Sequence, residues 1–410
     1  MTHGAGAAAP GLYVHVPFCV RICPYCDFAV TPLARHGTSR FRRFHEALLR
    51  EIALRAGDAG SAGLAADTVY FGGGTPSLAP PGFFDHILGA LRDADLVVPS
   101  AFVILEANPE DVARDPGTAF RWVSEGVAGV SLGVQALDDR RLRFLGRAHT
   151  EAEARASVAL LAEARLAWIS LDLIYGTAGA TDRGLDRELR DAASLPGLDH
   201  VSAYELTIEP RTPFGFRAAR GEPLTGRNPA RRFRQVHETL ADAGFPAYEA
   251  SNFAAAPEHR SRHNWKYWTG APVLGIGPSA HSFVPDRSER HWNHRTLAAW
   301  AAAVEEGVLP TSGREVLTPA DRALEDVFLS LRTVDGLDLD RFAANYGEAV
   351  VAENEPVFAR WERQGLARRA PGEGPGERGR IRPTLDGLAV ADALARDVRL
   401  ERIPSATPTA

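Results

Sequence analysis

Short apolar runs rich in β-branched residues alternate with amphipathic stretches along the first half of the chain. The clearest helical pattern is FRRFHEALLREIALR, whose apolar side chains recur on one helical face at Phe41, Phe44, Leu48 and Ile52. Similar patterns lie near 80–93, 117–126, 150–166 and 182–194. The strand candidates are the runs at 12–16, 68–71, 102–106, 129–134, 169–174 and 201–206. About six alternations predict an α/β fold with a parallel sheet, which closes as a full or partial barrel or stays open.

The pattern changes after about residue 210. A connector rich in Pro, Gly and Arg is followed by a helical pattern near 231–243, and residues 246–295 are predicted to be loop-like. Helical patterns return at 318–332, 338–346 and 384–398, and APGEGPGERGR interrupts them as a loop or hairpin tip. We therefore expect four parts: a disordered lead-in at 1–10, a core domain at 11–245, an aromatic and His-rich connecting segment at 246–310, and a smaller, mainly helical domain at 311–410.

Composition and charge restrict the protein class. The 410 residues are 45% hydrophobic and 24% charged, as in a globular protein too long for one ordinary core. The net charge of −6 argues against a general nucleic-acid binder, so nucleic acid is not an expected partner. No apolar run spans a bilayer, and MTHGAGAAAP lacks the features of a signal peptide. We expect a cytoplasmic location, with transient membrane association left open.

The three cysteines of the chain all lie in HVPFCVRICPYCDF, at Cys19, Cys23 and Cys26. Three thiols cannot all form disulfides with one another, and the tight C-x3-C-x2-C spacing lets one loop wrap a compact metal centre. One coordination position is left for another ligand. A zinc ion with His15 as fourth ligand and an iron–sulfur cluster with one open iron both remain open on the cysteines alone.

Glycine-rich segments give a second signal. FGGGTP, residues 71–76, ends the second predicted strand, where consecutive glycines form either an ordinary tight turn or a backbone that lies directly against a ligand. It is not a Walker loop, because no Gly-Lys-Ser/Thr follows. GIGPSA, residues 275–280, formally fits a dinucleotide-binding fingerprint but lacks a convincing helix after it, so we reject that interpretation.

Taken together, the cysteine spacing, the aromatic Tyr25 before the last Cys and the glycine-rich strand end resemble the radical SAM superfamily. The resemblance implies a partial (β/α)6 TIM-like barrel. It also implies that the three thiolates hold a 4Fe-4S cluster, whose fourth iron binds S-adenosylmethionine (SAM). A one-electron donor such as flavodoxin or ferredoxin is then an expected partner.

Further motifs resemble one branch, the oxygen-independent coproporphyrinogen III dehydrogenases and their haem-chaperone relatives of the HemW type. They run in order from about residue 11 to 285 and include LYVHVPFC, FGGGTPSL, LEANPE, SLGVQALDD, LGRAHT, SLDLIYG, RHNWKYW and LGIGPSAHSF. The C-terminal part resembles the same family more weakly.

The resemblance also implies SAM-binding positions at the C-terminal strand ends, where active residues of such sheets lie. It assigns Glu106 to the ribose and Arg147 to the methionyl carboxylate, and Asp172 either accepts from the ribose or anchors Arg147. The other positions are Tyr13, Tyr25, Gly73, Gly74, Thr75 and Gln135. Without the resemblance, each would be interpreted as a surface ion pair or a packed strand end.

Two features favour the chaperones over the dehydrogenases. Phe28 stands where the dehydrogenases have a further Cys, and the H-N-x-x-Y-W motif associated with haem binding is present. That motif consists of His263, Asn264, Tyr267 and Trp268, with His263 as the haem-iron ligand. His281 is a second, weaker candidate ligand. Residue types alone would favour an aromatic loop that closes the barrel with a structural His.

The chain departs from its relatives at two places. Ser261 occupies a position where many of them have Cys, and IYGTAGAT replaces the more usual IYGLPGQT.

Three hypotheses follow. The first is a haem chaperone that holds a SAM-ligated cluster and delivers haem to respiratory haemoproteins, with homodimer formation left open. The second is an oxygen-independent coproporphyrinogen III dehydrogenase that decarboxylates two propionates, so the sequence does not decide whether the chain is an enzyme. The third is a zinc-holding α/β protein, which iron and sulfide analysis would distinguish.

Overall fold

The computed structural model describes residues 9–33, 38–58, 61, 64–372, 374 and 376–403. The predicted lead-in at 1–10 lies outside these residues, apart from its last two positions.

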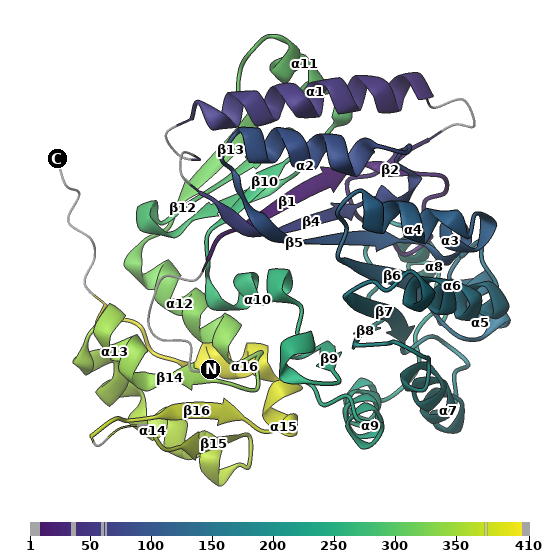
Figure 1. Cartoon of the computed structure of the whole chain (residues 1–410). Coiled ribbons are helices and arrows are strands. Elements are labelled where there is room, and N and C mark those ends of the chain that lie inside the picture. The colour runs from purple at the N-terminus through teal and green to yellow at the C-terminus, as the bar shows by residue number, and fades with distance from the viewer. Residues whose placement is uncertain are drawn as a thin grey trace.

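One large sheet runs through the described part of the chain. Its strand order is β13-β12-β11-β10-β1-β4-β5-β6-β7-β8-β9. Six parallel strands in its middle follow chain order: β1 (Gly11–Val16), β4 (Ala66–Gly73), β5 (Val97–Ala107), β6 (Gly129–Gln135), β7 (Trp168–Tyr175) and β8 (His200–Glu205). They form the curved wall of a partial barrel (Figure 1), so the predicted strands and their parallel arrangement are confirmed.

Helices cover the outer face of this wall (Figure 1). They are α1 (Thr38–Ala56), α2 (Phe83–Asp93), α3 (Pro109–Arg114), α4 (Gly117–Ser124), α5 (Asp139–Phe144), α6 (Glu151–Glu163), α7 (Asp182–Ala193) and α9 (Pro229–Asp242). α8 (Pro213–Ala218) instead packs against the cysteine loop, where the Phe214 N–H donates to the Pro24 carbonyl. The predicted apolar face of α1 is confirmed, because Phe44 and Leu48 pack in one core with Leu12 and Val14 of β1. Alternate residues of each strand therefore face outward to the helices, and the others face the barrel interior.

Residues 246–295 were predicted to be loop-like, and that prediction is wrong. They form β9 (Asn252–Ala254), α10 (Arg262–Thr269), β10 (Val273–Ile276), β11 (His281–Val284) and β12 (Glu289–Asn293). β10 pairs in parallel with β1 and extends the sheet beyond the barrel strands. These strands are too short, and too rich in Gly, His and Trp, to give a clear alternating pattern.

The next elements complete the extended sheet. β13 (Thr311–Val316) pairs with β12 at its edge, and α11 (Leu297–Glu305) packs beside α1. The strands β2 (Phe18–Cys19) and β3 (Thr31–Pro32) form a separate two-stranded parallel pair.

The C-terminal part is mainly helical, as predicted, and also contains a small sheet. Its helices are α12 (Pro319–Ser330), α13 (Leu339–Tyr346), α14 (Glu348–Arg363), α15 (Leu385–Leu388) and α16 (Ala391–Asp397). Its strands are β14 (Leu337–Asp338), β15 (Ala367–Ala370) and β16 (Arg380–Pro383), in the order β14-β16-β15. The predicted hairpin tip lies between β15 and β16, whereas α14 was not predicted, because Pro356 and several acidic residues interrupt its apolar pattern.

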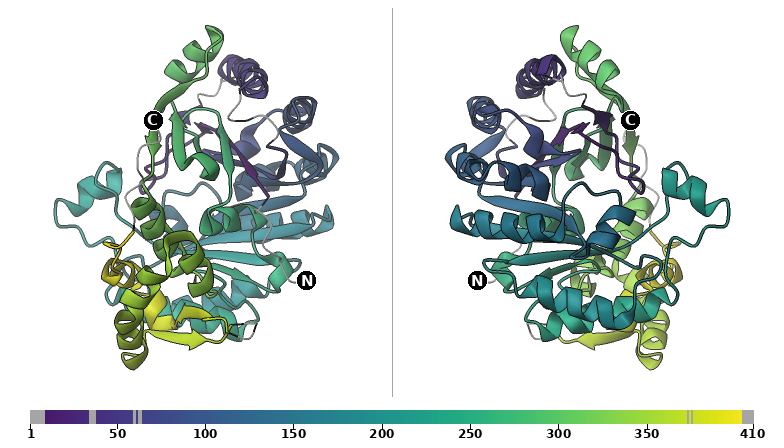
Figure 2. Two further views of the ribbon diagram at one scale, coloured as in Figure 1. Left: turned by 90° about the vertical axis from the view of Figure 1, so that its left-hand side faces the viewer. Right: turned by 90° about the vertical axis from the view of Figure 1, so that its right-hand side faces the viewer.

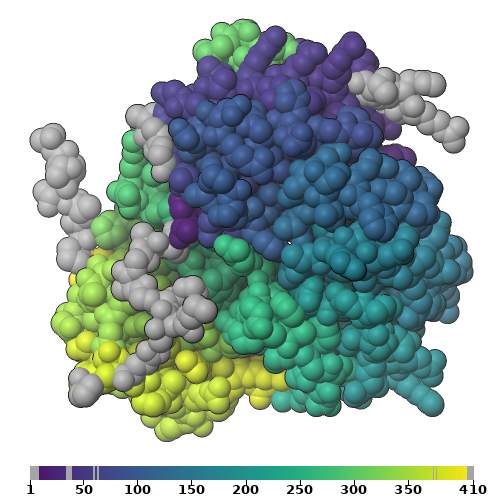
Figure 3. Space-filling model, in the orientation of Figure 1, coloured from purple at the N-terminus to yellow at the C-terminus, as the bar shows by residue number. Residues whose placement is uncertain are grey.

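The C-terminal elements have a hydrophobic cluster of their own, which includes Val327, Phe342, Phe358, Trp361 and Ile381. They lie at the end of the molecule opposite α1 and α11 (Figure 2), and the space-filling view shows them packed below the barrel segments (Figure 3). Where the four predicted parts begin and end stays a prediction. In the described residues, no helix is both long enough and apolar enough to cross a membrane.

Candidate functional site

The three cysteines lie on one loop above the barrel. Cys19 ends β2, and Cys23 and Cys26 follow in the segment that leads to β3. Backbone hydrogen bonds close this loop at its base, from Thr31 N–H to Pro17 O (2.6 Å) and from Leu33 N–H to Cys19 O (2.8 Å). All three thiols are free and partly exposed. Burial raises the pKa of Cys19 to about 11 and also raises that of Cys26, so a metal that binds them must displace protons.

A cavity of about 760 Å³ extends from the cysteine loop into the barrel. Its wall brings together most of the predicted site residues: Cys19, Cys23, Cys26, Tyr25, Gly73, Gly74, Thr75, Glu106, Gln135, Arg147, Asp172 and Asn264. Tyr13, His263, Tyr267 and Trp268 are not part of that wall. At the mouth, Phe28 and Val20 are 70% and 65% exposed, so they form an apolar rim of the cavity.

Two of the carboxylates on the cavity wall, Glu106 and Asp172, lie at predicted site positions. Glu106 accepts hydrogen bonds from the Tyr70 hydroxyl (3.0 Å) and the Gly73 N–H (3.0 Å), and Asp172 accepts from the Ser131 hydroxyl (3.0 Å). Burial, and then the nearby charge of Asp172, raises the pKa of Glu106 to about 7. Burial raises the pKa of Asp172 to about 6. Carboxylates without a paired cation are suited to accept hydrogen bonds from hydroxyl groups of a ligand.

Arg147 connects the carboxylate region to the cysteines. Its guanidinium donates to Cys23 Sγ (3.5 Å), to the Gly133 carbonyl (2.8 Å) and to Asn108 Oδ1. Its Nε is buried and has no hydrogen-bond partner among the described residues. Arg147 is thus held by Asn108 and Gly133 rather than by Asp172, and its side chain lines the cavity next to Cys23.

The glycines and Gln135 shape the cavity through their backbone. Gly73 has φ of +108°, and a Cβ there would lie 2.4 Å from the His15 ring. A Cβ on Gly74 would lie 2.5 Å from the Phe18 carbonyl oxygen. Gln135 has φ of +67°, next to an irregularity in the pairing of β6 with β7, and such strain in a non-glycine residue is typical of functional sites.

His15, the fourth ligand of the zinc hypothesis, is engaged by other groups. Its Nε2 lies 3.0 Å from the Ala29 carbonyl and its Nδ1 lies 3.1 Å from the Tyr13 hydroxyl. The ring therefore fixes the end of the cysteine loop to β1.

The haem motif lies on α10, below the cavity. Asn264 reaches the cavity wall, Tyr267 is 45% exposed and Trp268 is half-buried. His263 is 0% exposed, with Nδ1 3.0 Å from the Thr68 hydroxyl and Nε2 3.1 Å from the Tyr267 hydroxyl. Burial, and then the charge of Lys266, lowers the pKa of His263 to about 3, so the ring is neutral. As placed here, neither ring nitrogen is free to ligate a metal.

Two other residues named from the sequence have clear surroundings. His281 is exposed and stacks on Trp292, with ring centroids 5.8 Å apart, and it has no side-chain hydrogen bond to any described residue. Ser261 caps α10, since its hydroxyl accepts a hydrogen bond from the Asn264 N–H (3.3 Å). The absent Cys is thus replaced by a helix cap.

Sequence reasoning missed several residues of the cavity wall: Tyr70, Asn108, Ser131, Trp168, His200, Ser202 and Tyr204. A usable signal was present. Side chains of a strand that face the same side recur every second residue, so counting back from Gln135 reaches Ser131, and counting back from Asp172 reaches Ser170 and Trp168.

Comparisons with known proteins agree with this arrangement. Residues 13–192 match the Radical SAM superfamily, and residues 317–372 match the HemN C-terminal domain. The chain is 37% identical to heme chaperone HemW of Mycobacterium tuberculosis, over 84% of this chain and 87% of the relative. It is 34% identical to heme chaperone HemW of Escherichia coli, over 67% and 70%.

A solved structure shows the same fold over nearly the whole chain. It is coproporphyrinogen III oxidase (HemN) from Escherichia coli, described as a radical SAM enzyme, with a TM-score of 0.76 over 95% of this chain and 90% of that chain. The two sequences are 21% identical, so this likeness concerns the fold alone.

Proposed function

This chain belongs to the HemW family of the radical SAM superfamily, and on that premise we propose that it is a haem chaperone. It binds haem together with a SAM-ligated 4Fe-4S cluster and passes the haem to respiratory haemoproteins. Relatives named heme chaperone HemW that match most of the chain support this proposal. The observation that carries it is one cavity whose wall unites the three cysteines, Arg147 and the carboxylates Glu106 and Asp172.

The residues present fit the cluster and SAM. Cys19, Cys23 and Cys26 would hold the cluster at the top of the cavity, within reach of Arg147 and Thr75. When bound, the cluster supplies one-electron chemistry and leaves one iron for SAM. Arg147 would offset the negative charge of the thiolates, and its guanidinium on the cavity wall would attract the carboxylate of SAM.

The carboxylates would orient the ribose part of SAM. The two hydrogen bonds from Tyr70 and Gly73 fix the plane of the Glu106 carboxylate and use only two of its acceptor sites. The remaining lone pairs would accept hydrogen bonds from a ribose diol. Asp172 of β7 accepts a hydrogen bond from Ser131 of β6 and faces the same cavity. Tyr25 and Gln135 line the cavity and would contact the rest of the ligand, and Tyr13 supports this wall from behind through its stacking on Tyr70.

Haem is the cargo, and the α10 motif fits it in part. The Tyr267 and Trp268 rings can cover a porphyrin face, since both are at least partly exposed. Ligation of iron by His263 requires one ring nitrogen to be released, for instance Nε2 from the Tyr267 hydroxyl while Nδ1 keeps its bond to Thr68. Because His263 is 0% exposed, the residues that cover its ring must also move.

An anaerobic haem titration of the cluster-reconstituted chain tests the proposal, with the Soret band as readout. We expect saturable binding with one haem per chain, weakened or spectrally shifted in His263→Ala. His281→Ala is the matched control, because that ring is exposed and stacked on an aromatic residue but lies outside the motif. If His281→Ala shifts the spectrum and His263→Ala does not, the ligand assignment is wrong.

Failure of the wild-type chain to bind haem stoichiometrically would contradict the chaperone function. Assay of coproporphyrinogen III decarboxylation then tests the dehydrogenase alternative. Zinc without sulfide in the purified protein would contradict both hypotheses.

A further inference from the structure

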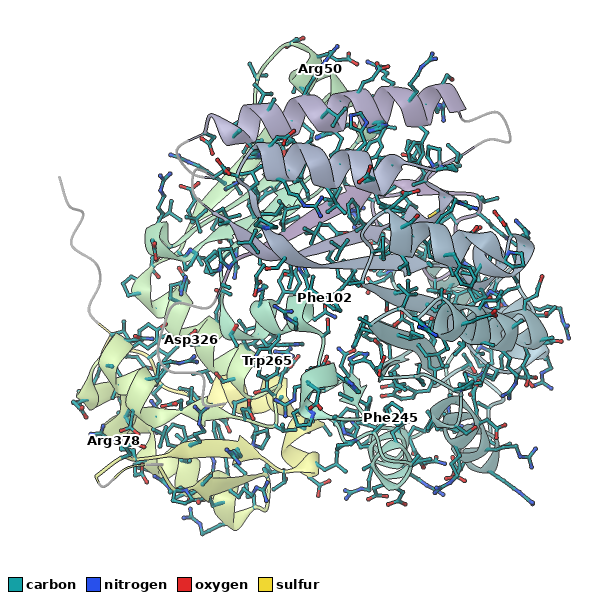
Figure 4. The ribbon with its side chains drawn as sticks, viewed as in Figure 1. Arg50, Phe102, Phe245, Trp265, Asp326 and Arg378 are labelled. Carbon is teal, nitrogen blue, oxygen red and sulfur yellow. The ribbon has the colours of Figure 1, made fainter. Side chains whose placement is uncertain are left out.

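His263 lies between two parts of the molecule that the proposed function treats separately. It sits on α10, in the haem motif, but its ring enters the barrel wall, where Thr68 of β4 binds it. The approach is close, because a Cβ on Gly11 of β1 would lie 3.2 Å from the His263 ring. In the view of Figure 4, Trp265 of the same helix lies between Phe102 of β5 and the C-terminal elements. α10 thus lies at the end of the barrel where β1 and β4 begin.

The His263 ring stacks on a residue of the SAM pocket. Its centroid lies 5.1 Å from that of Tyr70, with 26° between the planes. Tyr70 also stacks on Tyr13, with centroids 6.2 Å apart and 20° between the planes. Two rings therefore pack against Tyr70, whose hydroxyl donates to Glu106.

The Tyr70 hydroxyl is one of two donors that orient Glu106. It donates to one carboxylate oxygen at 3.0 Å, and Gly73 N–H donates to the other at 3.0 Å. A carboxylate with a donor on each oxygen has one preferred plane, so loss of either donor lets it rotate. Three contacts in series thus run from α10 to the carboxylate: a hydrogen bond that fixes His263, a ring stack and a second hydrogen bond.

We propose that His263 is a positioning residue of the SAM pocket, which holds Tyr70 against Glu106 through the ring stack. The inference rests on the proposed function only in taking Glu106 as a SAM ligand. The proposal gives His263 of the haem motif a second role, which it has when no haem is bound.

SAM affinity of the cluster-reconstituted, haem-free protein tests the proposal by isothermal titration calorimetry. We expect His263→Ala to raise the dissociation constant about tenfold, equivalent to about 1.4 kcal/mol. Tyr70→Phe should raise it to a similar extent. The double variant should bind no more weakly than Tyr70→Phe alone, because both changes act through the same hydroxyl.

The chain offers a matched control. His237 of α9 is also buried, its Nε2 lies 3.1 Å from the Ala250 carbonyl, and it packs on Phe253 away from the cavity. His237→Ala should lower stability and leave SAM affinity unchanged. If His263→Ala does not fold, His263→Gln takes its place. The glutamine amide can still form a hydrogen bond with Thr68 but cannot stack on the Tyr70 ring.

The outcomes separate this inference from the proposed function. A folded His263 variant with SAM affinity within twofold of wild type overturns it, and so does a double variant whose effects add. Normal haem binding with weakened SAM binding in His263→Ala supports it and overturns His263 as haem ligand. Absence of SAM binding by the wild-type protein overturns both.

Discussion

Replacing Glu106 by Gln should make the ligand-free chain more stable above neutral pH and less able to bind SAM. The change keeps the side chain's size and leaves an amide oxygen that can accept one of the two hydrogen bonds from Tyr70 and Gly73. It removes a negative charge from a site where burial and the charge of Asp172 oppose ionisation. The charged carboxylate therefore lowers the free energy of unfolding of the wild-type chain, in exchange for an acceptor in the proposed ligand site.

The size and sign of the effect follow from the pKa. The carboxyl ionises near its ordinary value of 4.5 in the unfolded chain and near about 7 in the folded chain. Between these values the folded chain binds more protons than the unfolded chain, so the free energy of unfolding falls as pH rises. Each pH unit is worth about 1.4 kcal/mol, and the whole interval about 3 kcal/mol. Water that enters the cavity reduces the observed value toward about 1 kcal/mol.

Urea unfolding of the ligand-free chain at several pH values between 4 and 8 measures the difference. We expect wild type and Glu106→Gln to converge at the acid end and to separate as pH rises, with the variant about 1 to 3 kcal/mol more stable at pH 8. Glu249→Gln is the control, since burial also raises the pKa of Glu249 to about 7 and that residue lies outside the cavity wall. It should gain stability with no loss of SAM affinity. A difference between wild type and Glu106→Gln that is independent of pH would refute the reasoning.

Three further changes test the cysteine loop, the glycine-rich end of β4 and a buried ion pair on α1. His15→Leu removes the ring that fixes the cysteine loop, so we expect less iron and sulfide per chain after reconstitution than in His45→Leu, whose ring packs between outer helices; equal contents would contradict that role. Gly73→Ala places alanine at φ of +108° against the His15 ring, and should lower the free energy of unfolding by about 1–3 kcal/mol in urea. Glu51→Ala leaves Arg55 buried without its partner, and should cost about 3–5 kcal/mol, whereas a loss below about 1 kcal/mol would show that the ion pair is dispensable.

The barrel could be predicted from the sequence because its strands and helices carry strong periodic signals. The apolar face of α1 and the buried runs of β1, β4 and β7 match the positions expected for them. The cysteines and the glycine-rich end of β4 were also identifiable from the sequence, because each motif consists of rare or special residues within a few positions of one another. The cavity brings both to one end of the barrel.

The segment that carries the haem motif could not be predicted in the same way. Its short strands depend on pairing with distant parts of the chain, as β10 does with β1, and such pairing leaves little trace in local periodicity. α10 has polar and aromatic residues on all sides, because one side faces Thr68, another faces the cavity and a third is exposed. The buried state of His263 is a tertiary property that the motif does not reveal.

The position of α10 joins the two ligands of the proposed function in one element. His263 binds Thr68 of the barrel wall, Asn264 reaches the cavity wall, and the partly exposed Tyr267 directs its hydroxyl to His263. Ligation through Nε2 displaces the Tyr267 hydroxyl and can keep the Thr68 bond, whereas an outward turn of the ring would break the Thr68 bond and the stack on Tyr70 and so disturb Glu106. If the ring turns outward, linkage predicts that haem and SAM weaken each other's binding by the same factor, which haem titrations with and without SAM would measure; equal haem affinity in both titrations would show that the ring keeps its place.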